Sequence, residues 1–229
     1  QQRLLLECSW EAMENAGIAR DQVAGSRTGV FVGMWTGDYE ELVFRDRDAL
    51  DLYCTTGSGR YAASGRLSYF YNLRGPSITV DTACSSSLVA LHLACQSIRS
   101  GDSEYALVGA VNLILNPSVN LGYSRAGMLS AEGLCKFGDA SASGYVRSEG
   151  GAVLLLKPLS SALAANDPIL ALIRGSAVNN DGQGSGSLMA PSGEGQAEML
   201  RLAYANSGVH PAQVGYFEAH GTGTNVGDP

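Results

Sequence analysis

The sequence predicts an α/β fold with mostly parallel sheets, covered by helices on both faces. Short apolar runs with the length of strands alternate along the chain with longer segments at helical spacing. The runs at residues 105–115 and 151–157 are apolar almost throughout rather than alternating, which is typical of strands covered on two faces. Hydrophobic residues make up 45% of the 229 positions and charged residues 16%, so the chain can bury a sizeable core and nothing indicates disorder.

The first predicted elements are a helix over residues 1–16 and a strand over residues 28–35. The apolar residues that share one face of this helix are Leu5, Cys8, Ala12 and Ala16. Gly17 is the expected stop, because glycine readily takes the left-handed conformation that ends many helices.

Three segments then lead toward the centre of the chain. Residues 37–44 predict a short helix whose acidic side chains face solvent. Residues 53–59 are rich in turn-forming residues, and residues 61–73 return to helical spacing. We therefore expect one short helix, a turn region and one longer helix here.

The most informative stretch, residues 76–88, changes its period within a few positions. Ile78 and Val80 alternate with polar residues, as in a short strand. The apolar residues that follow share a helix face, and they are Leu88, Leu91, Cys95 and Ile98. Gly101 then provides a stop signal. The pattern predicts a strand that turns directly into a helix, with Cys84 at the junction.

Cys84 is the candidate nucleophile, because the first turn of a helix favours a thiolate. Unpaired backbone N–H groups and the positive end of the helix dipole lie there, and the same N–H groups can stabilise an oxyanion beside the sulfur. Ala83, Ser85 and Ser86 are small, so a substrate carbonyl can approach closely. The local pattern alone leaves a buried, inert cysteine as an equal alternative.

The middle of the chain predicts a strand, a helix and a long loop. Residues 105–115 form a strongly apolar run with the length of a buried strand. Asn116 and Pro117 are suited to the cap and first position of a helix that extends to about Arg125. Residues 128–149 have no clear periodicity, and loops of this length are usually functional or covered by a partner.

The last third begins with a buried strand over residues 151–157, a helix that starts at Pro158, and a further strand over residues 169–178. Residues 179–195 are rich in glycine and serine, but helical spacing resumes directly afterwards, which favours a substrate-facing loop over a domain boundary. The helical positions are Gln196, Met199, Leu200, Ala203 and Tyr204. A final strand is expected over residues 214–217.

Composition excludes several classes of function. A net charge of −7 with no basic run argues against nucleic acid as a partner. Five cysteines without paired spacing indicate neither a disulfide framework nor a zinc site, and they fit a reducing compartment. No run approaches the ~20 apolar residues needed to span a bilayer. We therefore expect a cytoplasmic protein with no metal and no membrane partner.

Two motifs resemble those of β-ketoacyl synthases, specifically the ketosynthase domains of type I modular polyketide synthases. Residues 81–88 read Asp-Thr-Ala-Cys-Ser-Ser-Ser-Leu, which is similar to the family's nucleophile motif. Residues 218–224 read Glu-Ala-His-Gly-Thr-Gly-Thr, which is similar to the motif around its first active-site histidine. The chain departs from the family at Ser143 and Leu134, where an acidic and a basic residue are common.

The resemblance implies a thiolase-like fold, layered α-β-α-β-α with mostly parallel sheets. Residues 1–229 would then be a partial ketosynthase domain, truncated at both ends, with most of the first half of the fold and the start of the second. We expect these residues alone to be inactive. Family members need a further histidine and a lysine, for which this chain offers no assignment.

The resemblance also implies roles for four residues. Cys84 would accept an acyl chain as a thioester, and His220 would bind the thioester carbonyl of a malonyl group and assist its decarboxylation. By position alone, a histidine at a strand end is more often structural than catalytic. Thr222 and Thr224 match residues that hydrogen-bond the pantetheine arm of a carrier protein.

The implied activity is a decarboxylative Claisen condensation between the acyl chain and a malonyl-type extender. The implied partners are acyl and malonyl thioesters, an acyl carrier protein that delivers the phosphopantetheine, a neighbouring acyltransferase domain in the same polypeptide, and a second copy in a homodimer. No cofactor would be bound directly. Two alternatives stay open, a fatty-acid synthase ketosynthase and a non-elongating ketosynthase that transfers acyl chains or serves as a dimer scaffold.

Overall fold

The computed structural model describes residues 1–228, which form two compact units. The first unit comprises Gln1–Asn116 and Ser148–Leu172. The second comprises Pro117–Arg147 and the chain from Ile173 onward. None of the helices in residues 1–228 has both the length and the apolar character required to cross a membrane.

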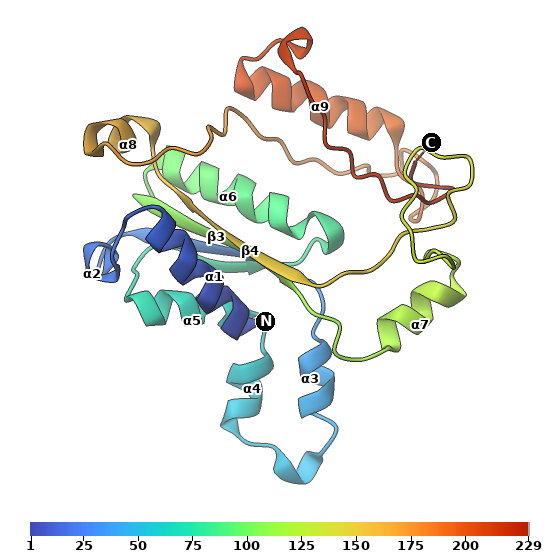
Figure 1. The fold of residues 1–229 in the computed structure, drawn as a ribbon, viewed down its shortest axis with the longest axis horizontal. Helices are drawn as coiled ribbons and strands as arrows, with labels where there is room; N and C mark the ends of the chain where they lie inside the picture. Colours follow the sequence, from blue (N-terminus) through green and yellow to red (C-terminus); the bar gives the residue numbers. More distant parts are fainter. Residues whose placement is uncertain (229) are drawn as a thin grey trace. The chain divides into compact units, whose positions relative to one another are not determined.

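A four-stranded sheet with the order β2-β1-β3-β4 forms the centre of the first unit (Figure 1). Its strands are β1 (Thr28–Gly33), β2 (Ser77–Val80), β3 (Tyr105–Asn112) and β4 (Gly150–Leu156). Strand β1 runs parallel to both β2 and β3, whereas β4 is antiparallel to β3. The sheet is therefore mostly parallel, as predicted, and helical crossovers connect its parallel strands.

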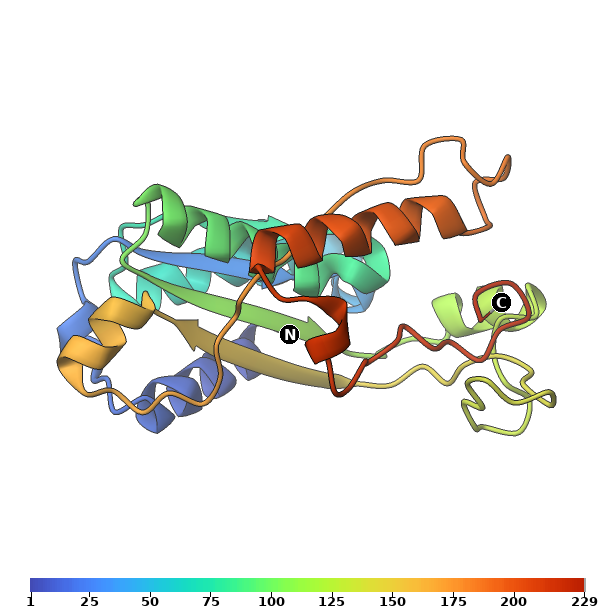
Figure 2. The same ribbon diagram turned by 90° about the horizontal axis from the view of Figure 1, so that it is seen from above.

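Helices cover both faces of this sheet (Figures 1 and 2). On one face, α6 (Ser86–Ser100) packs on β1 and β3. On the other face, α1 (Gln2–Asn15) packs on β3 and β4, while α5 (Tyr61–Tyr71) packs on β1 and β2. The shorter helices of this unit are α2 (Arg20–Val23), α3 (Asp38–Val43), η1 (Arg47–Ala49), α4 (Leu52–Ser58), η2 (Ala83–Ser85) and α8 (Leu159–Ala165).

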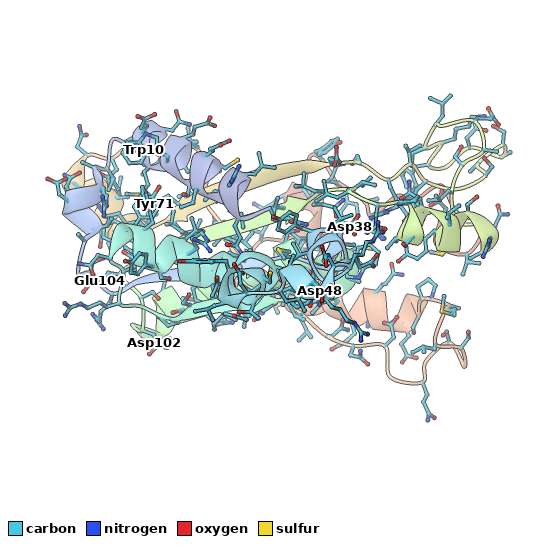
Figure 3. The ribbon with its side chains drawn as sticks, turned by 90° about the horizontal axis from the view of Figure 1, so that it is seen from below. Trp10, Asp38, Asp48, Tyr71, Asp102 and Glu104 are labelled. Atoms are coloured by element: carbon cyan, nitrogen blue, oxygen red, sulfur yellow. The ribbon has the colours of Figure 1, made fainter. Side chains whose placement is uncertain are left out.

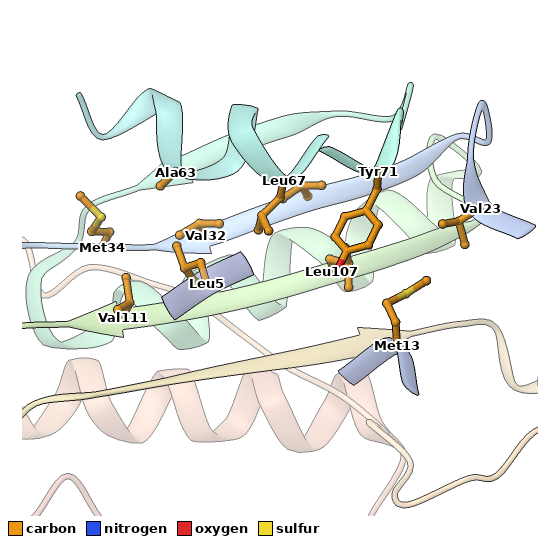
Figure 4. Close-up of a cluster of buried hydrophobic side chains, with 11 residues drawn as sticks. Leu5, Met13, Val23, Val32, Met34, Ala63, Leu67, Tyr71, Leu107 and Val111 are labelled. Carbon is orange, nitrogen blue, oxygen red and sulfur yellow. The ribbon is translucent and has the colours of Figure 1, made fainter. Parts of the chain in front are cut away.

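The two faces of β1 contribute to two hydrophobic clusters. Under α1 and α5, Figure 4 shows a cluster of large side chains that includes Leu5, Leu67, Tyr71, Val32 and Leu107. Under α6, the buried residues are Phe31, Ala90, Ala94, Ala106 and Val108. The alanines bring the α6 backbone close to the sheet, which determines where the N-terminal end of α6 meets the ends of β1 and β2.

The second unit has helices but no strand ladder within the described residues. Its elements are α7 (Ser118–Arg125), α9 (Gly193–Ser207) and η3 (Pro211–Gln213). The long loop predicted over residues 128–149 is confirmed, and an isolated bridge between Leu129 and Tyr145 closes it. The ring of Tyr145 also makes an edge contact with the ring of Tyr123 in α7.

The predicted apolar face of α1 is confirmed only in part, because Leu5 is buried but Cys8, Ala12 and Ala16 are half-buried. The buried residues of α1 are Leu5, Ser9 and Met13. Ser9 is fully buried because its hydroxyl lies 3.0 Å from the Tyr71 hydroxyl, so a polar residue occupies the core-facing stripe. The expected stop is confirmed, since Gly17 has a left-handed φ of 67° directly after the helix.

The predicted solvation of the acidic helix α3 is wrong for its first residue. Asp38, labelled in Figure 3, is only 2% exposed. Its Oδ2 accepts hydrogen bonds from the backbone N–H groups of Leu115 (2.9 Å) and Asn116 (3.4 Å). The carboxylate is buried because it binds the chain that leaves β3. Glu40 and Glu41 are exposed, as expected.

The turn region predicted over residues 53–59 is a helix instead. Asp51 caps α4 by accepting a hydrogen bond from the N–H of Cys54 at 3.1 Å. At its other end, Gln2 of α1 donates to the carbonyls of Thr56 and Gly57, each at 3.1 Å. These tertiary bonds outweigh the weak helix propensity of a sequence with two threonines and a glycine.

Two predicted strands, at residues 169–178 and 214–217, are not formed. Both segments are irregular, and none of the strands in the described residues forms a ladder with either of them. An apolar run becomes a strand only when another strand completes its hydrogen bonds. Strand β4 is formed as predicted, but the expectation that it is buried is wrong, since Leu154 is 50% exposed.

Candidate active site

Cys84 lies at the junction that the sequence predicts, at the carboxyl end of β2 and immediately before α6. One detail differs, because Cys84 lies in the 3₁₀ turn η2 and α6 itself begins two residues later. The side chain is exposed, so the alternative of a buried cysteine at this position is wrong. Ala83, directly before it, has a left-handed φ of 54°, an unusual conformation for a residue with a side chain.

Side chains from both ends of the turn hold this junction in place. The buried Ser86 hydroxyl accepts the N–H of Thr82 at 2.9 Å and donates to the Ala83 carbonyl at 2.6 Å. Asp81 accepts the N–H of Ala83 at 3.0 Å, and its other oxygen forms an ion pair at 2.8 Å with Arg60, the residue directly before α5. These bonds stabilise the strained φ of Ala83, and therefore the position of the next residue, Cys84.

The end of β1 supports the junction from the sheet. A side chain at Gly33 would place its Cβ only 2.6 Å from the backbone carbon of Ser86 and from the nitrogen of Ser87. No Cβ tolerates such a contact, so only glycine allows the N-terminal end of α6 to rest on β1. The consequence is an exposed thiol at a helix N-terminus, where oriented backbone N–H groups can stabilise negative charge.

His220, Thr222 and Thr224 lie in the second unit, on residues 218–224, which we call the His220 loop. His220 is exposed, whereas Gly223 is buried. Gly221 and Gly223 have left-handed φ values of 50° and 67°, so the loop turns sharply on both sides of Thr222.

The two threonines of the loop form one hydrogen-bonded group. Their hydroxyl oxygens are 2.8 Å apart, and Thr222 also donates weakly to Asp228 at 3.4 Å. The same Asp228 oxygen accepts the N–H of Gly223 at 2.9 Å. Asp228 was not predicted as a site residue, because a carboxylate that binds backbone N–H groups leaves no motif in sequence.

Residues 135–138 of the long loop, which we call the bracing segment, pack directly against the His220 loop. The Cys135 Sγ lies 3.4 Å from the carbonyl oxygens of both Gly221 and Thr222. A Cβ on Gly221 would approach the Phe137 ring to 2.9 Å. At the end of the segment, the Gly138 N–H donates to Asp228 at 3.2 Å.

Serine contacts occupy the positions where the long loop departs from the family pattern. Ser143 lies 3.4 Å from the Ser130 hydroxyl, which also accepts the N–H of Leu134 at 3.4 Å. An ion pair is still present, between Lys136 and Glu132 at 2.7 Å. The loop therefore keeps a polar bracing without an acidic residue at 143 or a basic one at 134.

Models of one family match the chain almost from end to end. Residues 1–162 match the β-ketoacyl synthase N-terminal domain, and residues 170–229 match the β-ketoacyl synthase C-terminal domain. Among curated proteins, the chain is 50% identical over 229 residues to one component of the phenolphthiocerol/phthiocerol polyketide synthase of Mycobacterium tuberculosis. It is 49% identical over 228 residues to a highly reducing polyketide synthase of Cryptosporiopsis sp.. The alignments cover all of this chain but only 12% and 9% of those proteins.

Solved structures agree with this assignment. The ketosynthase from module 6 of the bacillaene synthase of Bacillus subtilis superimposes with a TM-score of 0.90 at 38% identity. An oxazolomycin ketosynthase domain of Streptomyces albus superimposes with a TM-score of 0.92 at 41% identity. Each comparison covers all of this chain and 39% of the solved chain. These neighbours are ketosynthases of the thiolase-like fold, which confirms the predicted fold class.

Proposed function

Because the chain belongs to the β-ketoacyl synthase family, as a ketosynthase of the polyketide synthase type, we propose that it serves decarboxylative Claisen condensation. Cys84 accepts the growing acyl chain, and the His220 loop handles the malonyl-type extender. The observation that carries the proposal is the exposed Cys84 thiol at the junction of β2 and α6, held by Ser86 and Asp81.

In the first half-reaction, the Cys84 sulfur attacks the acyl thioester, forms a new C–S bond and releases the thiol of the donor. The carbonyl oxygen becomes an oxyanion as the sulfur adds. Backbone N–H groups at the start of α6, which follows the turn that contains Cys84, are suited to stabilise that charge. The junction thus provides both the nucleophile and part of the charge stabilisation.

In the second half-reaction, His220 binds the thioester carbonyl of the malonyl group. Breakage of the carboxylate C–C bond releases CO₂ and leaves an enolate, whose oxygen the imidazole stabilises. The enolate carbon attacks the acyl group on Cys84 and expels the sulfur, so the cysteine is regenerated. His220 is exposed at the start of a sharply turned loop, which suits contact with an incoming substrate.

Thr222 and Thr224 contact the pantetheine arm of the extender. Either hydroxyl can donate in the 2.8 Å bond between them, and Thr224 also accepts the N–H of Gly227 at 3.0 Å. Each oxygen still has a lone pair that these bonds do not use. The lone pairs that remain are acceptors, so these hydroxyls suit the amide N–H groups of a pantetheine arm.

The chain acts as part of a larger assembly. The partners are an acyl carrier protein that delivers the phosphopantetheine, an acyltransferase domain in the same polypeptide, and a second copy of the chain, in the cytoplasm. Residues 1–229 alone do not catalyse condensation. In support of this, the chain spans only 39% of the solved ketosynthases that it matches, and Leu170 and Tyr216 are 95% and 79% exposed.

The test of the function is acyl transfer to one thiol. In the complete synthase, brief incubation with an acyl thioester and peptide mass mapping should place the acyl group on Cys84. Cys135 is the sharpest internal control, because it is the other exposed cysteine among the five. Acylation chiefly at Cys135 or any other cysteine would contradict the proposal.

A further inference from the structure

The bracing segment contains a thiol for which the proposed reaction has no use. Cys135 is exposed, lies outside the nucleophile junction and makes contact with the backbone of the His220 loop. We infer that Cys135 is a positioning residue, whose thiol fixes the two peptide groups that follow His220. The inference rests on the proposed function of His220 and assigns a residue that supports it.

The contacts of Cys135 reach the backbone of the His220 loop at a glycine and at the residue after it. Its Sγ lies 3.4 Å from the carbonyl oxygens of Gly221 and Thr222, and its single S–H is shared between them. Gly221 has a φ of 50°, and glycine adopts several backbone conformations at little cost. Without the thiol, the carbonyl of Gly221, the residue directly after His220, loses the side-chain donor that holds it.

Two further contacts show that the bracing segment is shaped to hold this loop. The Phe137 ring fills the space where a Cβ on Gly221 would stand, at 2.9 Å. A Cβ added to the buried Gly223 would lie 3.2 Å from the backbone nitrogen of Lys136 and 3.5 Å from the Cys135 sulfur. The two glycines thus allow backbone and thiol to meet closely, which a loosely packed surface loop would not require.

The consequence for the reaction is a division of roles within the second unit. His220 touches the substrate, and Cys135 acts only through the peptide groups next to it. Small errors in the position of a catalytic group reduce its effect strongly. Loss of the thiol should therefore slow the step that uses His220 and leave acyl transfer to Cys84 unchanged.

The experiment compares two variants of the complete synthase. Cys135→Ala removes the thiol of the bracing segment, and the control, Cys8→Ala, removes a thiol from α1 instead. We expect Cys135→Ala to load Cys84 normally but to release CO₂ from malonyl-carrier protein about fivefold more slowly, the scale of one lost hydrogen bond. Cys135→Ser, which keeps a shorter donor, should fall between wild type and alanine. Cys8→Ala should match wild type in both steps.

A second readout does not depend on activity. Diethylpyrocarbonate should modify His220 at a rate that differs several-fold between Cys135→Ala and wild type, while modification of His210 stays the same. If Cys135→Ala equals wild type in both CO₂ release and His220 modification, the positioning role is wrong and the proposed function stands. If wild type releases no CO₂ but the His220 rate still changes, the function is wrong and the positioning stands.

Discussion

The nucleophile junction and the His220 loop are held in place by different kinds of contact. The Cys84 junction rests on the sheet, with the N-terminal end of α6 against Gly33 at the end of β1, and Ser86 and Asp81 add hydrogen bonds to it. The His220 loop has no sheet beneath it among the described residues, and polar contacts from the bracing segment and Asp228 hold it instead. The position of Cys84 therefore depends on the sheet as well as on local hydrogen bonds, whereas His220 depends on local contacts without a sheet beneath them.

This difference suits the two tasks that we propose for Cys84 and His220. A nucleophile that must point at a thioester while charge develops beside it benefits from rigid N–H groups at a helix end. A histidine that meets a carrier-bound substrate lies on a loop, which is where binding residues are common. Damage to the core should affect the first task and damage to the bracing should affect the second.

The largest expected effect comes from Gly33→Ala in the complete ketosynthase domain. The new Cβ would lie 2.6 Å from the Ser86 backbone, so α6 must move away from β1. We expect a loss of about 3 kcal/mol in unfolding free energy, together with poor acyl loading. Gly65→Ala in α5, where no atom lies within 4 Å, is the matched control and should be neutral or slightly stabilising. Equal stability of the two variants, measured by denaturant unfolding, would refute the packing argument.

A smaller and more local effect is expected from Asp228→Asn. In the wild type, the two carboxylate oxygens accept the backbone N–H groups of Gly223 and Gly138. Asparagine has one oxygen and one NH₂ group, so one of these two hydrogen bonds is lost. CO₂ release should slow roughly tenfold, about 1.4 kcal/mol, with acyl loading unchanged. Asp139→Asn is the control, because that carboxylate binds Ser141 within the same turn. If Asp228→Asn also slowed acylation of Cys84, the Cys84 junction and the His220 loop would not be independent.

The smallest effect concerns an ion pair at the end of β4. The Lys157 Nζ lies 2.5 Å from the Asp167 Oδ2, and this hydrogen bond raises the pKa of the lysine above its ordinary value of 10.5. A raised folded-state pKa means that the contribution to stability is complete below 10.5 and is lost as the pH rises through the folded value. The difference in unfolding free energy between wild type and Asp167→Asn should be about 1 kcal/mol at pH 9 and shrink above pH 10.5. A difference that does not change with pH would show that the pair is not the cause.

Much of the nucleophile side could be predicted from sequence, because its information is local. The change from period two to helical spacing around Cys84 places the junction correctly within two residues. The stop at Gly101 is also confirmed, with a left-handed φ of 82°. What sequence did not reveal is the support of the junction, since Gly33 lies about fifty residues away along the chain.

The errors have a common physical cause, which is that distant partners decided the outcome. Asp38 is buried because it binds backbone N–H groups 77 and 78 residues further on. Ser9 occupies the core face of α1 because Tyr71 offers a hydroxyl. The motif around His220 makes the histidine a candidate site residue, but Cys135 and Asp228 bind backbone atoms and leave no pattern of spacing.

The most direct test of the account separates the two half-reactions with His220→Ala in the complete synthase. If the junction and the loop divide the work as proposed, this variant should acylate Cys84 at the wild-type rate and release CO₂ from malonyl-carrier protein at least about 100-fold more slowly. Normal decarboxylation by the variant would contradict the account, since His220 would then be a structural residue and the loop would have no part in the chemistry.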